Sequence, residues 1–250
     1  MQVHYEQTLV EECVFRATRA DPALEREMHA ALDPIYALRK KSNGESDAQF
    51  QNVFSAFFAR LKLDGVIVDL LAEQPQIAES VSRCIVSQAE RQRAESAELF
   101  SKKQDVTHRT LMIRITPDSL ISPNRAAGHL RRELFHVADM VNDTFAYRPD
   151  QIDEINPRRN LILDRYRVYW DIYIEGRLYR RQQGDPRAMN RLRHALPRTL
   201  GVDYTDHSRA IFDQLFTARQ LTHQQLLSWA RQPQQCGCAS ATSVGHPKEN

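Results

Sequence analysis

The segment Thr110–Thr116, TLMIRIT, and the run Ala126–Val141 that follows it decide the expected fold class. The first segment alternates apolar and polar residues and is rich in β-branched side chains, which is typical of a strand. In the second, apolar residues recur at helical spacing. Because most of the remaining chain has helical periodicity, we expect an α+β protein, mainly α, with one short sheet.

The same periodicity predicts the other elements and the domain organisation. Asp21-Pro22 caps and begins a helix, and Asp64-Gly65 interrupts another. The expected helices cover residues 22–38, 50–61, 66–74, 77–100, 126–141, 161–181, 187–196 and 206–229. We therefore expect an N-terminal helical region (1–105) packed on a core (106–230), followed by a flexible C-terminal tail (231–250).

Composition narrows the class of protein. The chain has 250 residues, of which 42% are hydrophobic, and a formal net charge of +2, as in globular proteins. It has no apolar run of about 20 residues, so we expect no membrane partner. The first residues lack a basic stretch followed by an apolar one, and we expect a cytoplasmic protein. Cys13 and Cys84 are expected in the core, while Cys236 and Cys238 fall in the tail, where a metal or redox role stays an alternative.

Positive charge is concentrated between residues 158 and 198. This stretch holds eleven arginines, no lysine and four acidic residues. It predicts either solvated helix faces or a surface for an anionic partner. Within 161–181 the arginines do not line one stripe, and no known nucleic-acid motif is present, which disfavours a nucleic acid.

The helix expected at 126–141 carries the residues with the most chemistry. At 100° per residue, its polar and charged side chains form a stripe beside an apolar one. This polar stripe consists of His129, Arg132, Glu133 and His136, and the apolar Met140 lies at its end. A titratable side chain at the border of a core must be paired or bind a metal, because its burial costs several kcal/mol, very roughly.

The pentapeptide Arg132-Glu133-Leu134-Phe135-His136 resembles the H-E-x-x-H helix of zincin metalloproteases, with Arg in place of the first His. In zincins an edge strand of a small sheet precedes this helix, and here residues 110–116 precede it. In gluzincins a second helix supplies a Glu, and here the helix at 161–181 offers Glu175. The resemblance covers roughly residues 108–180 and implies a gluzincin-like core.

The resemblance also implies roles for single residues. Glu133 corresponds to the general base, while His136 and Glu175 correspond to zinc ligands. Arg132 occupies the remaining ligand position and cannot coordinate, because guanidinium keeps its proton. His129 and Asp171 are candidate replacement ligands.

Two further residues are candidates for supporting roles. Asp139 follows His136 by three residues and could fix the orientation of its imidazole. Tyr147 could donate its phenol to an oxyanion; packing is its alternative role.

The helix at 161–181 contains two features that call for a partner. Asp171 and Glu175 are four residues apart and share a face, so burial of that face requires a cation: a metal, Arg132, Arg167 or Arg177. Gly176 costs a helix about 1 kcal/mol relative to Ala. It predicts close approach of a ligand or another backbone.

These observations leave three functional hypotheses. The first is a metalloprotease-like protein with an altered and inactive zinc site, which binds a peptide or protein partner in its cleft. The second is a helical adaptor that binds an anionic partner, such as nucleic acid, through residues 158–198. The third is an active zinc-dependent peptidase or hydrolase with an unusual ligand set.

Overall fold

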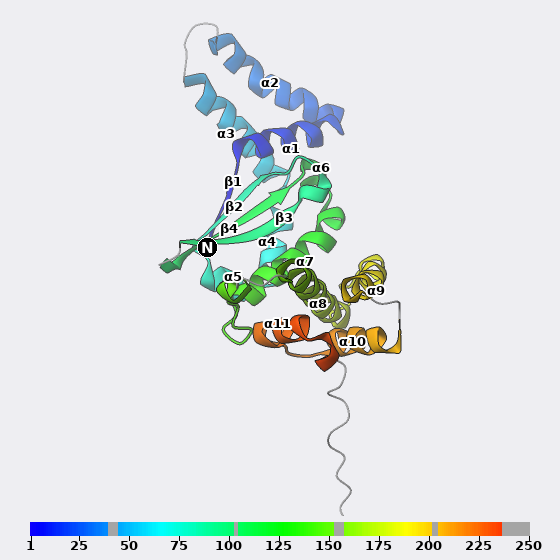
Figure 1. The fold of residues 1–250 in the computed structure, drawn as a ribbon. Coiled ribbons are helices and arrows are strands. Elements are labelled where there is room, and N and C mark those ends of the chain that lie inside the picture. The colour runs from blue at the N-terminus through cyan, green and yellow to red at the C-terminus, as the bar shows by residue number, and fades with distance from the viewer. Residues whose placement is uncertain (40–44, 103–104, 153–157, 202–204, 237–250) are drawn as a thin grey trace, which may run out of the picture. The chain divides into compact units, whose positions relative to one another are not determined.

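The computed structural model describes residues 1–39, 45–102, 105–152, 158–201 and 205–236, and it confirms the expected fold class. The described part is mainly helical and holds one four-stranded mixed sheet (Figure 1). The chain divides into two compact units, Met1–Ala138 and Asp139–Asn250. The boundaries that we expected at residues 105 and 230 stay a prediction.

The sheet lies in the first unit and has the strand order β1-β2-β4-β3. Strands β1 (Gln2–Tyr5), β2 (Arg83–Gln88) and β4 (Asp105–Ile115) run parallel, and β3 (Ser96–Lys102) runs antiparallel to β4 at the edge. Alternation in β4 follows the prediction, since Leu111, Ile113 and Ile115 are fully buried while Met112 and Arg114 are partly exposed. The strand at 110–116 is therefore internal, and the two edge strands of the described sheet are β1 and β3.

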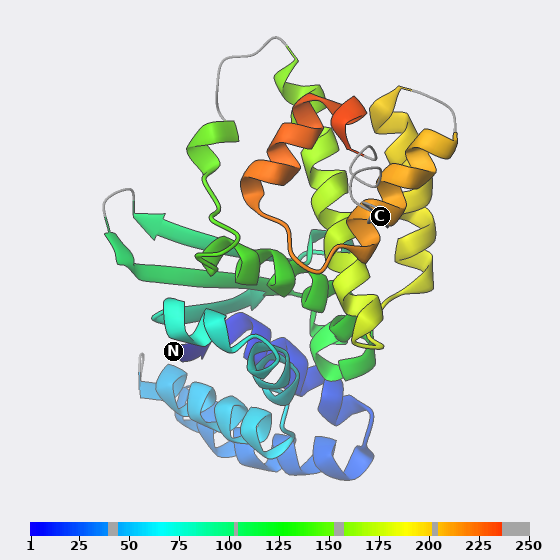
Figure 2. The same cartoon turned by 90° about the horizontal axis from the view of Figure 1, so that it is seen from below.

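Helices cover the sheet within the first unit. They are α1 (Gln7–Arg19), α2 (Pro22–Arg39), α3 (Glu45–Arg60), α4 (Gly65–Ala72), α5 (Pro75–Ser80), α6 (Pro117–Ile121) and α7 (Pro123–Val141), with a short 3-10 turn η1 (Gln92–Ala94). In Figure 2 the blue-to-cyan helices α1–α5 lie on one side of the sheet and the green α7 on the other. The layers bury the apolar faces of sheet and helices together.

The second unit is built around α8 (Arg159–Arg180). This helix contacts α9 (Pro186–Leu200), α10 (Asp206–Thr217) and α11 (His223–Arg231). Two short 3-10 turns, η2 (Pro149–Ile152) and η3 (Pro233–Gln235), complete it. Tyr169, Ile172 and Ile174 of α8 are fully buried, which agrees with a central helix.

Two expected helices are wrong. Residues 77–100 form α5, β2, η1 and β3, because β2 lies between two parallel neighbours and is apolar on both faces, so its sequence does not show strand alternation. Residues 206–229 form two helices, because α10 ends at Thr217 and Thr222 caps the start of a new helix, α11. The string Thr222-His223-Gln224-Gln225 is a capping box that could have indicated this start.

The cysteines are buried where the structure describes them. Cys13, Cys84 and Cys236 have no exposed surface and form no disulfide among the described residues, although Cys84 lies on β2 rather than on a helix. Cys236 Sγ donates to Gln214 Oε1 at 3.5 Å. Cys238 lies outside the described residues.

No helix in the described part is both long and apolar enough to cross a bilayer.

Candidate functional site

The polar stripe of α7 has the burial that its sequence predicts. Leu130, Leu134 and Val137 are buried, while Arg132, Glu133 and His136 are partly exposed. The helix is fixed to the rest of its unit by Arg131, whose Nε and Nη2 donate to both carboxylate oxygens of Glu73 at 2.6 and 2.7 Å. Because such bidentate pairs have a defined geometry, the orientation of the stripe is well set.

His129 connects α7 with the edge strand. Its Nε2 lies 2.8 Å from the backbone oxygen of Glu95, the residue before β3. Because a carbonyl only accepts, Nε2 carries the proton of this hydrogen bond. Its Nδ1 lies 4.0 Å from Glu133 Oε1. His129 thus acts as a link between α7 and β3, and it could bind a metal through Nε2 only if that link broke.

Glu95 continues this connection toward the sheet. Its buried carboxylate accepts hydrogen bonds from Thr116 through the backbone N–H at 3.0 Å and the hydroxyl at 2.6 Å. Its second oxygen and the hydroxyl of Ser119 are both buried without a hydrogen-bond partner among the described residues. An unpartnered buried acceptor is costly, so a small polar group could be held here. Neither residue was predicted from the sequence.

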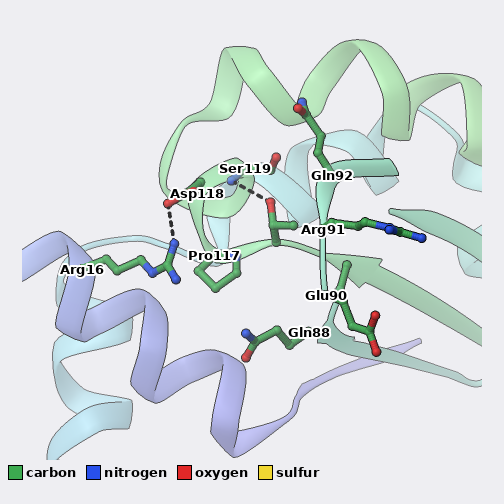
Figure 3. Close-up of a pocket in the computed structure, with 10 residues that line it drawn as sticks. Arg16, Gln88, Glu90, Arg91, Gln92, Pro117, Asp118 and Ser119 are labelled. Carbon is green, nitrogen blue, oxygen red and sulfur yellow. Dashed lines mark hydrogen bonds and ion pairs between the residues drawn. The ribbon is translucent and has the colours of Figure 1, made fainter. Parts of the chain in front are cut away.

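Thr116 and Ser119 line a pocket of about 180 Å³ at the carboxyl ends of β2 and β4. Residues 88–92 and 116–119 form two of its sides and Arg16 of α1 a third (Figure 3). The Arg16 guanidinium lies 2.8 Å from Asp118 Oδ1, as the dashed line shows. Ligands commonly bind at this end of parallel strands. None of the residues that we had singled out lines this pocket.

Glu175 is buried in the second unit and supports the fold there. Its Oε1 accepts a hydrogen bond of 2.7 Å from the backbone N–H of Asp185. Asp185 in turn caps α9 by accepting from the N–H of Arg187. One oxygen of the predicted zinc ligand therefore holds the connection between α8 and α9. Asp171, one turn earlier, is partly exposed.

Asp139 and Tyr147 also have defined partners in the second unit. Arg177 donates to both oxygens of the buried Asp139, at 2.8 and 2.9 Å, and the Trp170 indole donates at 2.8 Å. The Tyr147 ring lies 5.6 Å from Trp170 and 5.2 Å from the ring of His223. These contacts favour the packing role for Tyr147, and they supply Asp139 with the cation that a buried carboxylate needs.

The described side chains form no ready-made cluster of metal ligands. Within the described residues, no group of three or more His, Cys, Asp or Glu side chains could hold a metal. Arg132 stands at one ligand position of the motif, and a guanidinium repels a metal cation. We therefore derive no chemical step that depends on zinc.

Comparison with known proteins adds no family. No family model, curated protein or solved structure matches this chain.

Proposed function

We propose that this protein is a metalloprotease-like protein without a working zinc site, and that it binds an extended peptide segment of a partner protein along β3. The observation that carries this proposal is the position of β3. It is an antiparallel edge strand that pairs with β4 alone among the described residues, and α7 follows β4 in the chain after the short helix α6. An edge strand with unpaired backbone groups can receive a peptide as an additional strand.

The connection between β3 and α7 supports the same proposal. His129 links α7 to Glu95, the residue before β3, so the polar stripe of α7 begins close to this edge strand. Phe100 of β3 is 47% exposed, and it offers an apolar side chain to a partner. A peptide added to β3 would gain affinity from backbone hydrogen bonds and specificity from such side chains.

Arg132 supports binding without hydrolysis. Zincin chemistry requires a metal to lower the pKa of a bound water to about 7. The first ligand position holds an arginine instead, and Glu133 Oε1 lies 4.0 Å from His129 Nδ1. The proposal therefore includes peptide recognition and excludes peptide cleavage.

The proposal also places the protein in the cytoplasm. Among the described residues, the three cysteines form no disulfide, which fits a reducing compartment. Burial raises the pKa of the Cys13 and Cys84 thiols to about 12, so these thiols stay protonated and unreactive at neutral pH.

Peptides that bind the protein can be selected by phage display. Versions of a selected peptide with N-methyl groups at alternate backbone positions then test whether it binds as an added strand. Only every second residue of an added strand directs its N–H toward β3. One of two peptides methylated at alternate positions should lose binding at least about tenfold, since it loses several backbone hydrogen bonds. The other should bind as the parent does, and fluorescence anisotropy measures both.

Two variants of β3 are the matched controls on the protein. The N–H groups of Glu98 and Leu99 point to opposite sides of the strand. Of Glu98→Pro and Leu99→Pro, the one that removes the outward N–H should stay folded and lose the peptide. Equal binding of both methylated peptides would contradict strand addition. Zinc-dependent cleavage of the peptide that Glu133→Gln abolishes would instead support the active hydrolase.

A further inference from the structure

Helix α9 in the second unit presents a narrow stripe of basic side chains. Arg187, Arg191, His194 and Arg198 follow one another at intervals of four, three and four residues. At 100° per residue, these positions fall within an arc of about 60°. All four residues are exposed. The residues of 158–198 that share one face are therefore those of α9, labelled in Figure 1, and not those of α8.

Little negative charge offsets this stripe. Helix α9 contains no acidic residue. Asp185, at the N-cap, lies 3.8 Å from Arg191 and is also exposed in part. Among the described residues, the side chains of Arg187, His194 and Arg198 form no ion pair. Three arginines on adjacent turns of one helix repel each other, and an anionic partner bound to this face would relieve that repulsion.

The helix that carries the stripe is held rigidly. Its opposite face buries Ala188 and Leu196. Arg193 lies outside the stripe and packs over the Phe212 ring of α10 at 5.2 Å. Arg165 of α8 donates to the Thr199 carbonyl at 3.0 Å near the end of α9. The exposed arginines thus project from a helix that is already packed in place, so binding a partner costs little backbone conformational entropy.

The spacing and the residue type indicate the chemistry of the partner. The stripe is about 16 Å long at 1.5 Å per residue, and a nucleic acid strand presents a phosphate about every 3.4 Å along its axis. Arginine binds phosphate through two parallel hydrogen bonds, which favours it over lysine here. The stripe has no exposed apolar neighbour on α9 that could enter a lipid bilayer, because the large apolar residues of α9 lie on its opposite face.

We propose that the stripe Arg187, Arg191, His194 and Arg198 of α9 binds the phosphate backbone of a nucleic acid without sequence preference. The stripe belongs to the second unit, whereas the proposed peptide edge of β3 belongs to the first. The sequence disfavoured a nucleic acid because arginines over 161–181 are scattered around their helix. The structure brings a different set, from the following helix, onto one face.

Fluorescence anisotropy with a labelled DNA duplex of about 30 base pairs tests this proposal on the full chain. With about three phosphate contacts, the logarithm of the binding constant should fall with the logarithm of salt concentration with a slope of about −3. The combined variant Arg187→Ala, Arg191→Ala and Arg198→Ala should bind the duplex at least about tenfold more weakly near 50 mM salt, because it loses three phosphate contacts. Its affinity should depend little on salt, with a slope close to zero. Alanine favours an exposed helix, so the variant should stay folded.

Arg209→Ala and Arg219→Ala are the controls, because both arginines are exposed in the second unit and lie outside the stripe. They should leave affinity and slope unchanged, and the combined variant should keep the binding of any peptide selected on β3. An equal loss in the controls, or none in the combined variant, overturns the proposal. Tighter binding to phosphatidylserine vesicles or to polyglutamate than to the duplex also overturns it, in favour of a membrane or an acidic protein.

Discussion

Gly176 shows what a single residue contributes to the second unit. A Cβ atom at this position would overlap the carbonyl oxygen of Phe216 and lie 2.8 Å from its carbonyl carbon. That carbonyl also accepts a hydrogen bond of 2.7 Å from Arg180 Nη1. The glycine therefore lets the backbones of α8 and α10 approach closely. This is the close approach that the sequence predicted from a glycine within a helix.

Gly176→Ala should therefore destabilise the protein by at least about 2 kcal/mol, because α10 must move away from α8. Gly128→Ala in α7 is the matched control, since nothing lies within 4 Å of the Cβ it adds. Gly128→Ala should raise the free energy of unfolding by up to about 1 kcal/mol, because alanine has a higher helix propensity than glycine. Urea unfolding of both variants measures the difference. Similar stability of the two would show that α8 and α10 separate without cost.

At the scale of the element, α7 allows the resemblance to zincins to be tested directly. Arg132 and His136 are four residues apart, so they project from adjacent turns on the same face. Arg132→His would place two imidazoles at the spacing that binds zinc in H-E-x-x-H helices. If the core is zincin-like, this one substitution should restore zinc binding, together with a third ligand from outside the motif.

The metal content of purified protein measures this outcome at neutral pH. Arg132→His should retain about one equivalent of zinc after gel filtration, and Arg132→His combined with His136→Ala should retain none, as two protein ligands rarely hold zinc. Absence of zinc from both would count against the resemblance. Stoichiometric zinc in the unmodified protein, lost on His136→Ala, would favour the active hydrolase instead.

The stability of the whole molecule should depend on pH through His223. Its ring is fully buried, and its Nδ1 lies 2.7 Å from the Tyr166 hydroxyl. Burial lowers the pKa of His223, because the charged imidazolium would lose its hydration. Below the unfolded-state pKa of about 6.5, the unfolded chain takes up a proton that the folded protein does not. Folding stability should therefore fall as the pH decreases from about 6.5 to the lower pKa of the folded state.

Urea unfolding between pH 7.5 and 5 measures this effect. The contribution of His223 should have a slope of up to about 1.4 kcal/mol per pH unit. His223→Gln should make the profile flatter, whereas His207→Gln should leave it unchanged, because His207 is exposed on α10. A profile that is equally steep with His223→Gln would assign the pH dependence to other groups.

The sequence by itself determined the features that depend on local spacing. The fold class, the alternation of Leu111, Ile113 and Ile115, the buried apolar face of α7 and the need for space at Gly176 all follow from helix or strand period. Each depends on residues close together in the chain.

Only the tertiary structure decided which distant groups meet. β2 is a strand because it pairs with β1 and β4, and Arg16 joins the pocket at residues 88–92 and 116–119 through its bond with Asp118, about a hundred residues away. Glu175, which the resemblance assigns to a metal, is held in part by the N–H of Asp185. Such partners cannot be found from periodicity, because strand pairing and buried polar contacts depend on which surfaces the whole chain brings together.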